Sequence, residues 1–201
     1  MGRLIFVDQS RINMNPGPND GLSPSGEQTV VIGKRPKNWE PRFDFMGACT
    51  GRRLLALETR TPAERKAAGK KGWWKEDVIG FFRDTVAWAV LEADLHGVVI
   101  VIDKGLKITS GEVMAAMEEG GVDDVEEAVI LPSSTAKYIS PLDNTLWHDL
   151  KERIRARPLT SPAQALAALR AEWEATPLEH LRNYYHHCSL TRRTDPARGR
   201  H

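Results

Sequence analysis

The sequence has little cysteine, no long apolar run and no marked excess of either charge. Cys49 and Cys188 are the only cysteines among 201 residues, which is too few for a disulfide framework. The longest apolar stretches, such as residues 98–102, are far shorter than the roughly 20 residues that cross a bilayer. Lys and Arg total 28 against 27 Asp and Glu. A wholly basic nucleic-acid coat is therefore excluded, whereas local basic patches are not.

A secretion signal is also missing, because the first residues, MGRLIFVDQS, contain no apolar core followed by small residues. We therefore expect an intracellular protein, located in the nucleus of a eukaryote or in the cytoplasm and nucleoid of a bacterium. With 41% hydrophobic residues, a chain of this length can bury one sizeable core without disulfides or a structural metal. We expect no membrane partner.

The order of apolar patterns predicts an α/β fold. An early antiparallel hairpin precedes a βαβ unit, and residues 98–102 have the uninterrupted β-branched pattern of a central parallel strand. Residues 132–141 and the basic segment 60–75 are expected to be irregular. The predicted strands are 4–7, 29–32, 42–50, 54–58, 98–102 and 128–131, and the predicted helices are 75–95, 109–117, 143–157, 161–175 and 178–187. This order is compatible with an RNase H-like mixed five-stranded sheet flanked by helices. We divide the chain into a catalytic domain, 1–157, and a helical extension with a basic tail, 158–201.

Three aspartates fall where chemistry is expected in such a fold. Asp8 ends the first strand, Asp103 ends the central strand, and Asp143 begins the helix after the last strand. Ligand-binding groups of α/β sheets collect at the carboxyl ends of strands. Converging carboxylates repel one another unless divalent cations lie between them, and oxygen ligands favour Mg²⁺ or Mn²⁺. Two such ions can drive phosphodiester cleavage or strand transfer. The alternative is that each aspartate merely ends a strand or caps a helix.

The residues around these aspartates resemble mariner-type transposases of the DDE superfamily, a superfamily that also includes DDE endonucleases. The resemblance covers residues 3–157. Its elements are Ile5-Phe6-Val7-Asp8-Gln9-Ser10, Val99-Ile100-Val101-Ile102-Asp103-Lys104, and Leu131-Pro132 followed by Ser140-Pro141-Leu142-Asp143, Trp147 and Lys151. The 39 residues between Asp103 and Asp143 are close to the family spacing.

The resemblance implies that Asp8, Asp103 and Asp143 are the catalytic and metal-binding residues, with two Mg²⁺ or Mn²⁺ ions as cofactors. It also implies DNA as substrate and a homodimer for paired-end cutting. The chain departs from the family at Lys104, where an Asn is usual. Only seven residues precede Asp8, so the helix-turn-helix DNA-recognition module is not expected in this chain. A truncated element, a domesticated descendant and a split gene with a separate DNA-recognition chain remain open.

Basic and aromatic residues near these motifs are candidates for nucleic-acid contact. Clustered cations bind phosphates and make the affinity depend on salt. Trp73 and Trp74 have two interpretations, packing under the following helix and stacking on an unpaired base. Solvated helix faces remain the alternative for each basic patch. The predicted nucleic-acid-binding residues are Lys70, Lys71, Lys104, Trp147, Lys151 and Arg153.

The sequence therefore predicts a metal-dependent DNA endonuclease and strand transferase. One rival is an inactive, domesticated remnant that binds DNA or protein through the same surface. Another is an RNase H-like nuclease acting on hybrids or junctions. Serine hydrolases and P-loop NTPases are excluded because the sequence has neither Gly-x-Ser-x-Gly nor Gly-x-x-x-x-Gly-Lys-Ser/Thr.

Overall fold

A mixed five-stranded sheet forms the centre of the molecule. The structure, a computed structural model, describes residues 2–13, 42–157 and 161–188. Within the sheet the strand order is β3-β2-β1-β4-β5. The first three strands are antiparallel neighbours, and β4 and β5 continue the sheet in parallel with β1. The strands are β1 (Leu4–Asn13), β2 (Arg42–Cys49), β3 (Leu54–Arg60), β4 (Val98–Asp103) and β5 (Val125–Leu131).

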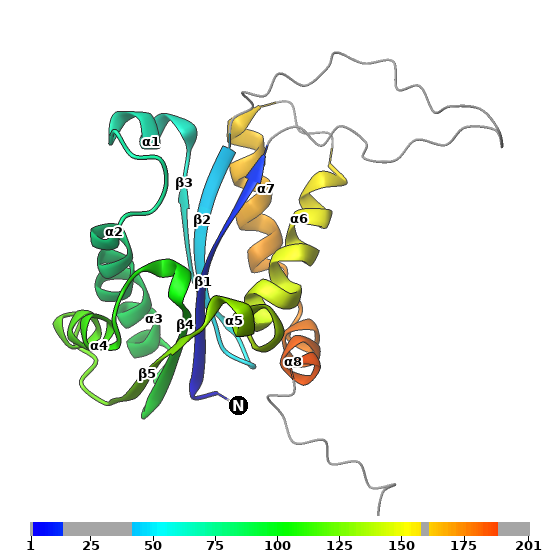
Figure 1. Cartoon of the computed structure of the whole chain (residues 1–201). Coiled ribbons are helices and arrows are strands. Elements are labelled where there is room, and N and C mark those ends of the chain that lie inside the picture. The colour runs from blue at the N-terminus through cyan, green and yellow to red at the C-terminus, as the bar shows by residue number, and fades with distance from the viewer. Residues whose placement is uncertain (1, 14–41, 158–160, 189–201) are drawn as a thin grey trace, which may run out of the picture.

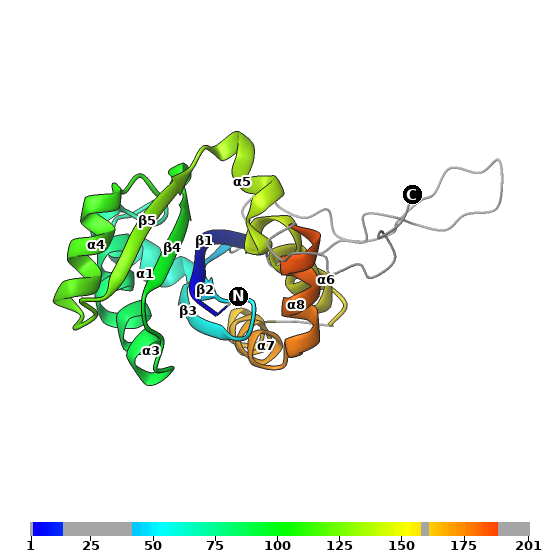
Figure 2. The ribbon, with the colours of Figure 1, turned by 90° about the horizontal axis from the view of Figure 1, so that it is seen from below.

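Helices cover both faces of the sheet, giving three layers (Figure 1). Seen from below, α1, α3 and α4 lie on one side and α6, α7 and α8 on the other (Figure 2). The first layer consists of α1 (Pro62–Ala67), α2 (Lys75–Gly80), the π-helical turn η1 (Phe81–Val86), α3 (Ala87–Glu92), the 3₁₀ turn η2 (Lys104–Leu106) and α4 (Ser110–Glu119). The second consists of α5 (Ser133–Ile139), the π-helical turn η3 (Leu142–Leu146), α6 (Trp147–Arg155), α7 (Pro162–Glu174) and α8 (Leu178–His187).

Each face of the sheet has its own hydrophobic core, because side chains alternate between the faces along a strand. Val7 and Ile102 belong to the core under η1, α3 and α4, whereas Phe6 and Val101 belong to the core under α6, α7 and α8. Residues of the C-terminal helices, such as Trp173 and Tyr185, are buried in this second core. The helical extension therefore packs directly on the sheet.

β1 extends beyond the end of its parallel neighbour β4, which leaves an open position beside the last residues of β1. Val7 pairs with Ile102, and β4 ends one residue later at Asp103. Beyond Asp8, β1 continues to Asn13 and pairs with β2. Open α/β sheets bind ligands at such points, outside the carboxyl ends of the strands.

The predicted fold class is confirmed, and three segments differ from prediction. The first strand does not end at Asp8 but continues to Asn13, because its later residues pair with β2. Residues 62–67 and 133–139 lie in segments predicted to be irregular but form α1 and α5. A capping box explains α1: the Thr61 side chain accepts from the Glu64 N–H, and the Glu64 carboxylate accepts from the Thr61 N–H. The predicted strand 29–32 and the basic tail lie outside the described residues. Among the helices that the structure describes, none has the length and apolar character to cross a membrane.

Candidate active site

Asp8 and Asp103 lie side by side on neighbouring parallel strands. Because Val7 pairs with Ile102, the register places Asp8 beside Asp103. Both follow residues that face the first core, so both face the second core, the side of α6, α7 and α8. The two carboxylates therefore share one face and one edge of the sheet, as the sequence predicts.

A tryptophan holds the Asp8 carboxylate. Asp8 is only 7% exposed, and the Trp147 indole Nε1–H donates to its Oδ2 across 2.9 Å. Burial raises the pKa of Asp8 to about 7; the Trp147 hydrogen bond opposes that rise, and the charges of Asp143 and Asp103 add to it. Asp8 therefore has an unusually high proton affinity, and the charges of both other aspartates contribute to it.

Trp147 is fixed from two further sides. Its ring stacks on Trp173 of α7, with ring centroids 5.5 Å apart and planes inclined by 25°. Beneath the two rings lies Gly47 of β2, which pairs with Asp8 in the sheet. A Cβ at this glycine would be 2.7 Å from Cη2 of Trp147 and 2.8 Å from Cη2 of Trp173. The absence of a side chain at Gly47 therefore makes room for the pair of rings that positions Asp8.

Asp103 is held by the loops that follow β4 and β5. Its Oδ1 accepts from the backbone N–H of Gly105 across 2.8 Å and from the Ser133 hydroxyl across 2.9 Å. Gly105 is the second residue of the turn η2 after β4, and Ser133 is the first residue of α5. These two donors fix the orientation of the carboxylate at the strand end.

Asp143 approaches the pair from the start of the next helix. Pro141 precedes the π-helical turn η3, and the buried Ser140 hydroxyl accepts from the Asp143 N–H at 3.4 Å. Asp143 itself is exposed, and its charge acts on both Asp8 and Lys151. Short π-helical turns are frequent at functional sites.

The chemistry of these donors suits a hard divalent cation. Three carboxylates supply the oxygen ligands that Mg²⁺ and Mn²⁺ prefer, and a cation would offset the repulsion that Asp8 experiences from the other two. As placed, however, the side chains do not close around an ion: the described part of the chain contains no group of three or more His, Cys, Asp or Glu that could hold one.

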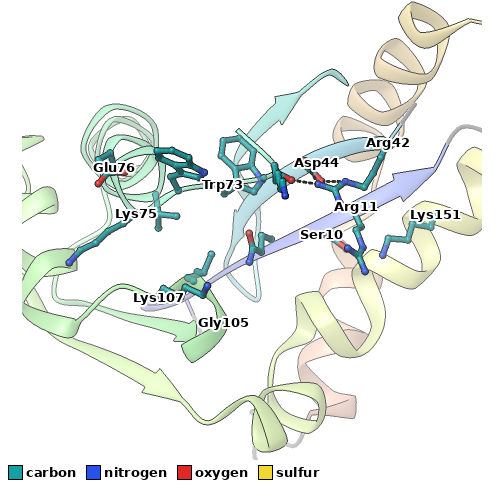
Figure 3. A pocket seen from close by; sticks show the side chains of 16 residues that line it. Ser10, Arg11, Arg42, Asp44, Trp73, Lys75, Glu76, Gly105, Lys107 and Lys151 are labelled. Atoms are coloured by element: carbon teal, nitrogen blue, oxygen red, sulfur yellow. Dashed lines mark hydrogen bonds and ion pairs between the residues drawn. The ribbon is translucent and has the colours of Figure 1, made fainter. Parts of the chain in front are cut away.

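A basic cavity of about 750 Å³ is lined by neighbours of the aspartates, Gln9 beside Asp8 and Gly105 near Asp103, and not by the three aspartates themselves. It opens where β1 runs past the end of β4, and Figure 3 shows Arg11 and Lys151 extending into it close together, opposite Lys107 and Lys75. Its lining consists of Gln9, Ser10, Arg11, Arg42, Asp44, Lys71, Gly72, Trp73, Trp74, Lys75, Glu76, Val78, Gly105, Leu106, Lys107 and Lys151. The cations outnumber the two carboxylates, so the cavity attracts anions.

Two predicted nucleic-acid contacts line this cavity, and one lies near it. Lys71 and Lys151 are lining residues, and the exposed Lys104 follows Asp103 directly. Burial lowers the pKa of Lys151, as do Arg155 and Arg11, whereas Asp143 and Asp8 raise it. Lys151 is thus placed between the acids and the cavity.

The other three predicted contacts have protein partners. Lys70 pairs with Asp77 at 2.6 Å. Arg153 pairs with Glu172 at 3.2 Å. Trp147 is 2% exposed and lies in the second core. Its placement does not support contact with nucleic acid, because the apolar face of α6 that contains it packs against the sheet.

Sequence reasoning missed the residues that support this site. Ser133, Gly47 and Trp173 act through contacts between distant segments, which no local pattern reveals. Arg11 is different, since it lies three positions after Asp8 on the same strand. Its charge at the end of a strand that carries an aspartate was a usable indication.

Comparisons with known proteins give structural neighbours only. No protein-family model matches the chain, and no curated protein does. The solved structures that match include a paired-end complex of the Mos1 mariner with Mn, with a TM-score of 0.70 and 14% identity over 94% of this chain and 53% of that one. The Mos1 strand transfer complex matches with a TM-score of 0.64 and 16% identity over 94% and 52%.

The Mos1 transposase catalytic domain, solved with raltegravir and Mg, also matches, with a TM-score of 0.53 and 11% identity over 94% of this chain and 79% of that one. This chain therefore spans about half the length of the Mos1 chains in the two complexes. Sequence motifs and structural likeness agree: the chain has the RNase H-like fold of the catalytic domain of the Mos1 mariner transposase.

Proposed function

We propose that this chain is a metal-dependent DNA endonuclease and strand transferase of the mariner-like transposase type. The observation that carries the proposal is the pairing of Asp8 and Asp103 on one face of neighbouring parallel strands, with Asp143 close enough to raise the pKa of Asp8. Structures of Mos1 solved with Mn and Mg support the same chemistry by likeness of fold. The catalytic and metal-binding residues in this proposal are Asp8, Asp103 and Asp143.

When bound, two Mg²⁺ or Mn²⁺ ions supply activation of a hydroxyl nucleophile and stabilisation of the leaving oxygen. The protein's own groups arrange the ligands. The Trp147 N–H orients Asp8, and the Gly105 N–H and Ser133 hydroxyl orient Asp103. Lys151 lies beside these acids and would attract the phosphate to be cut.

We extend this proposal to the partners that a mariner-like transposase would need to recognise DNA. A homodimer would bring two such sites together for paired-end cutting, and a separate chain would supply recognition of the transposon ends. Such a protein would act where DNA is found, in the nucleus of a eukaryote or in the cytoplasm and nucleoid of a bacterium.

The second candidate is a catalytically inactive remnant that binds DNA or protein. It is favoured by one observation, that the described residues form no closed group of metal ligands. Lys104 after the second aspartate also adds a positive charge beside the acids. Under this alternative the basic cavity would bind DNA without cutting it.

Nicking of supercoiled plasmid separates the two candidates. We expect the wild-type protein to nick plasmid in Mg²⁺ or Mn²⁺ and not in EDTA, and we expect Asp103→Asn and Asp143→Asn to abolish nicking. Asp84→Asn is the matched control, because Asp84 is an exposed aspartate that pairs with Arg83 on the outer helix. Salt-sensitive DNA binding by all four proteins, with no nicking by any of them, would contradict the enzyme and support the remnant.

A further inference from the structure

The basic cavity contains an exposed tryptophan, Trp74, which the binding of duplex DNA does not require. Trp74 lies in its lining and is 51% exposed. Its neighbour Trp73 is half-buried and packs against the first core. The two tryptophans thus differ in role: Trp73 anchors the segment, and Trp74 presents its ring to the cavity.

The backbone around Trp74 is held rigidly. Its N–H donates to Asp77 Oδ2 across 2.8 Å, and Asp77 also pairs with Arg60 and with Lys70. The guanidinium of Arg60 lies 4.2 Å from the ring centroid of Trp73. The backbone that carries the Trp74 ring is therefore ordered before a flat ligand binds, which lowers the entropy cost of stacking.

Cations beside Trp74 are arranged for a chain of phosphates. Lys70, which pairs with Asp77, places its Nζ over one face of the Trp74 ring, 5.1 Å from the centroid, so a base would stack on the other face. Across the cavity, Arg11, Lys107 and Lys151 have no carboxylate within ion-pair distance among the residues that the structure describes. By contrast, Arg42 is neutralised by Asp44, and Lys75 pairs with Glu112. Lys71, which precedes Gly72 and Trp73, also has no ion pair among the described residues, so uncompensated cations lie beside the tryptophans as well as across the cavity.

The volume of the cavity is compatible with a short segment of a single strand. A volume of about 750 Å³ is in the range of small-molecule pockets, so it accommodates a few nucleotides of one strand. An exposed aromatic ring with a cationic path is the combination that binds unpaired nucleotides, because every base has a face that stacks.

We propose that this cavity is a binding site for an unpaired DNA strand, in which Trp74 stacks on a base and Arg11, Lys107 and Lys151 contact the phosphates. The proposal rests on the proposed function, since it places a single strand next to the aspartates that would cut or join it. It names the substrate form: DNA that is unpaired at the reacting end.

Binding in EDTA tests the site separately from catalysis. The probes are a blunt duplex, the same duplex with a short unpaired 3′ tail, and the tailed duplex with an abasic tail. We expect the wild-type protein to bind the tailed duplex more tightly than the blunt and abasic probes. Trp74→Ala should reduce affinity for the tailed duplex by about 5- to 150-fold, the range for losing one to a few kcal/mol of base stacking, and Trp74→Phe should retain most of it.

Trp88→Ala is the matched control, because Trp88 is 61% exposed on α3 and does not line the cavity. The proposal would be overturned if the wild-type protein bound blunt and tailed probes equally, bound abasic and normal tails equally, or did not bind DNA. It would also be overturned if Trp74→Ala kept the tail preference unchanged. Asp103→Asn distinguishes the two proposals: it should lose nicking while it keeps the tail preference. A wild-type protein that nicks plasmid without any tail preference would refute this site alone.

Discussion

The Trp147 indole donates a hydrogen bond to Asp8, a residue 139 positions earlier in the chain, across 2.9 Å. This contact joins the start of α6 to the end of the parallel part of β1. Because an N–H donor favours the charged carboxylate, it opposes the effect of burial on Asp8. Trp147 is therefore a positioning residue that keeps Asp8 available as an anionic ligand.

Trp147→Phe removes this donor and keeps an aromatic ring against Trp173. A hydrogen bond to a charged group is worth about 1.5–3 kcal/mol, so the pKa of Asp8 should rise and the lower pH limit of nicking should move up by about one to two pH units. The measurement is the pH profile of Mg²⁺-dependent nicking, with Trp88→Phe as the control. A profile identical to that of the wild-type protein would show that the contact does not tune Asp8.

Gly47→Ala should destabilise the fold by about 1–3 kcal/mol, the usual cost of overpacking a core. The added Cβ would meet Trp147 and Trp173 at distances below 3 Å. Gly111→Ala is the control, because a Cβ added there on α4 would meet no neighbouring side chain within 4 Å, and alanine there favours the helix by roughly 0.5–1 kcal/mol. Urea unfolding should move the two variants in opposite directions. Equal stability of both would show that the tryptophan pair can shift freely.

Asp8→Asn should stabilise the metal-free protein at high pH. The pKa of Asp8 is about 7 in the folded protein and 3.8 in the unfolded reference, so the folded state holds the proton more tightly. Stability from Asp8 is complete below pH 4 and is lost as the pH rises toward 7. The difference between Asp8→Asn and wild type should therefore grow between pH 4 and 8, by about 1.4 kcal/mol per tenfold difference in proton affinity.

Thermal unfolding at several pH values measures the stability difference between Asp8→Asn and the wild-type protein. The same measurement with added Mg²⁺ is a second test. At pH 8 the ion should raise the melting temperature of the wild-type protein and leave that of Asp8→Asn nearly unchanged. If the two melting temperatures stay parallel from pH 4 to 8, Asp8 does not titrate in this range.

Lys151→Gln and Arg153→Gln separate DNA contact from internal ion pairing. Lys151 lines the basic cavity, so its loss should weaken DNA binding and reduce the slope of log affinity against log salt by about one. Arg153 pairs with Glu172 and Asp149, so its loss should lower stability and leave the slope unchanged. The check is DNA affinity across a salt series together with urea unfolding. If Arg153→Gln also reduced the slope of log affinity against log salt, Arg153 would contact DNA as the sequence predicts.

Much of the fold followed from local patterns. The β-branched run before Asp103 indicated a buried parallel strand, and the structure confirms it in β4. The capping box before Glu112 predicted α4 in the same way. α1 has an equivalent box at Thr61 and Glu64, which is easily missed because basic residues dominate that segment. α5 has no side-chain cap hydrogen bond, so its sequence offers no comparable indication.

The aspartates were predictable and their surroundings were not. The predicted strand end is correct for Asp103, whereas Asp8 lies within β1, which continues to Asn13. Asp143 lies after the Ser140-Pro141 turn, as predicted, and the catalytic role of all three stays a prediction. The predicted nucleic-acid contact of Trp147 conflicts with its helical spacing with Leu146 and Leu150, which indicates a buried face. The pairing of Asp8 with Gly47, and the stack above it, depend on sheet register and could be found only in three dimensions.

Mn²⁺ binding at pH 8, measured by electron paramagnetic resonance, shows whether the three aspartates hold divalent cations. The wild-type protein should bind Mn²⁺, and Asp103→Asn and Asp143→Asn should each weaken binding at least about tenfold, equivalent to roughly 1.4 kcal/mol. Asp84→Asn should bind as the wild-type protein does. No Mn²⁺ binding by the wild-type protein, or equal binding by all four, would contradict the account.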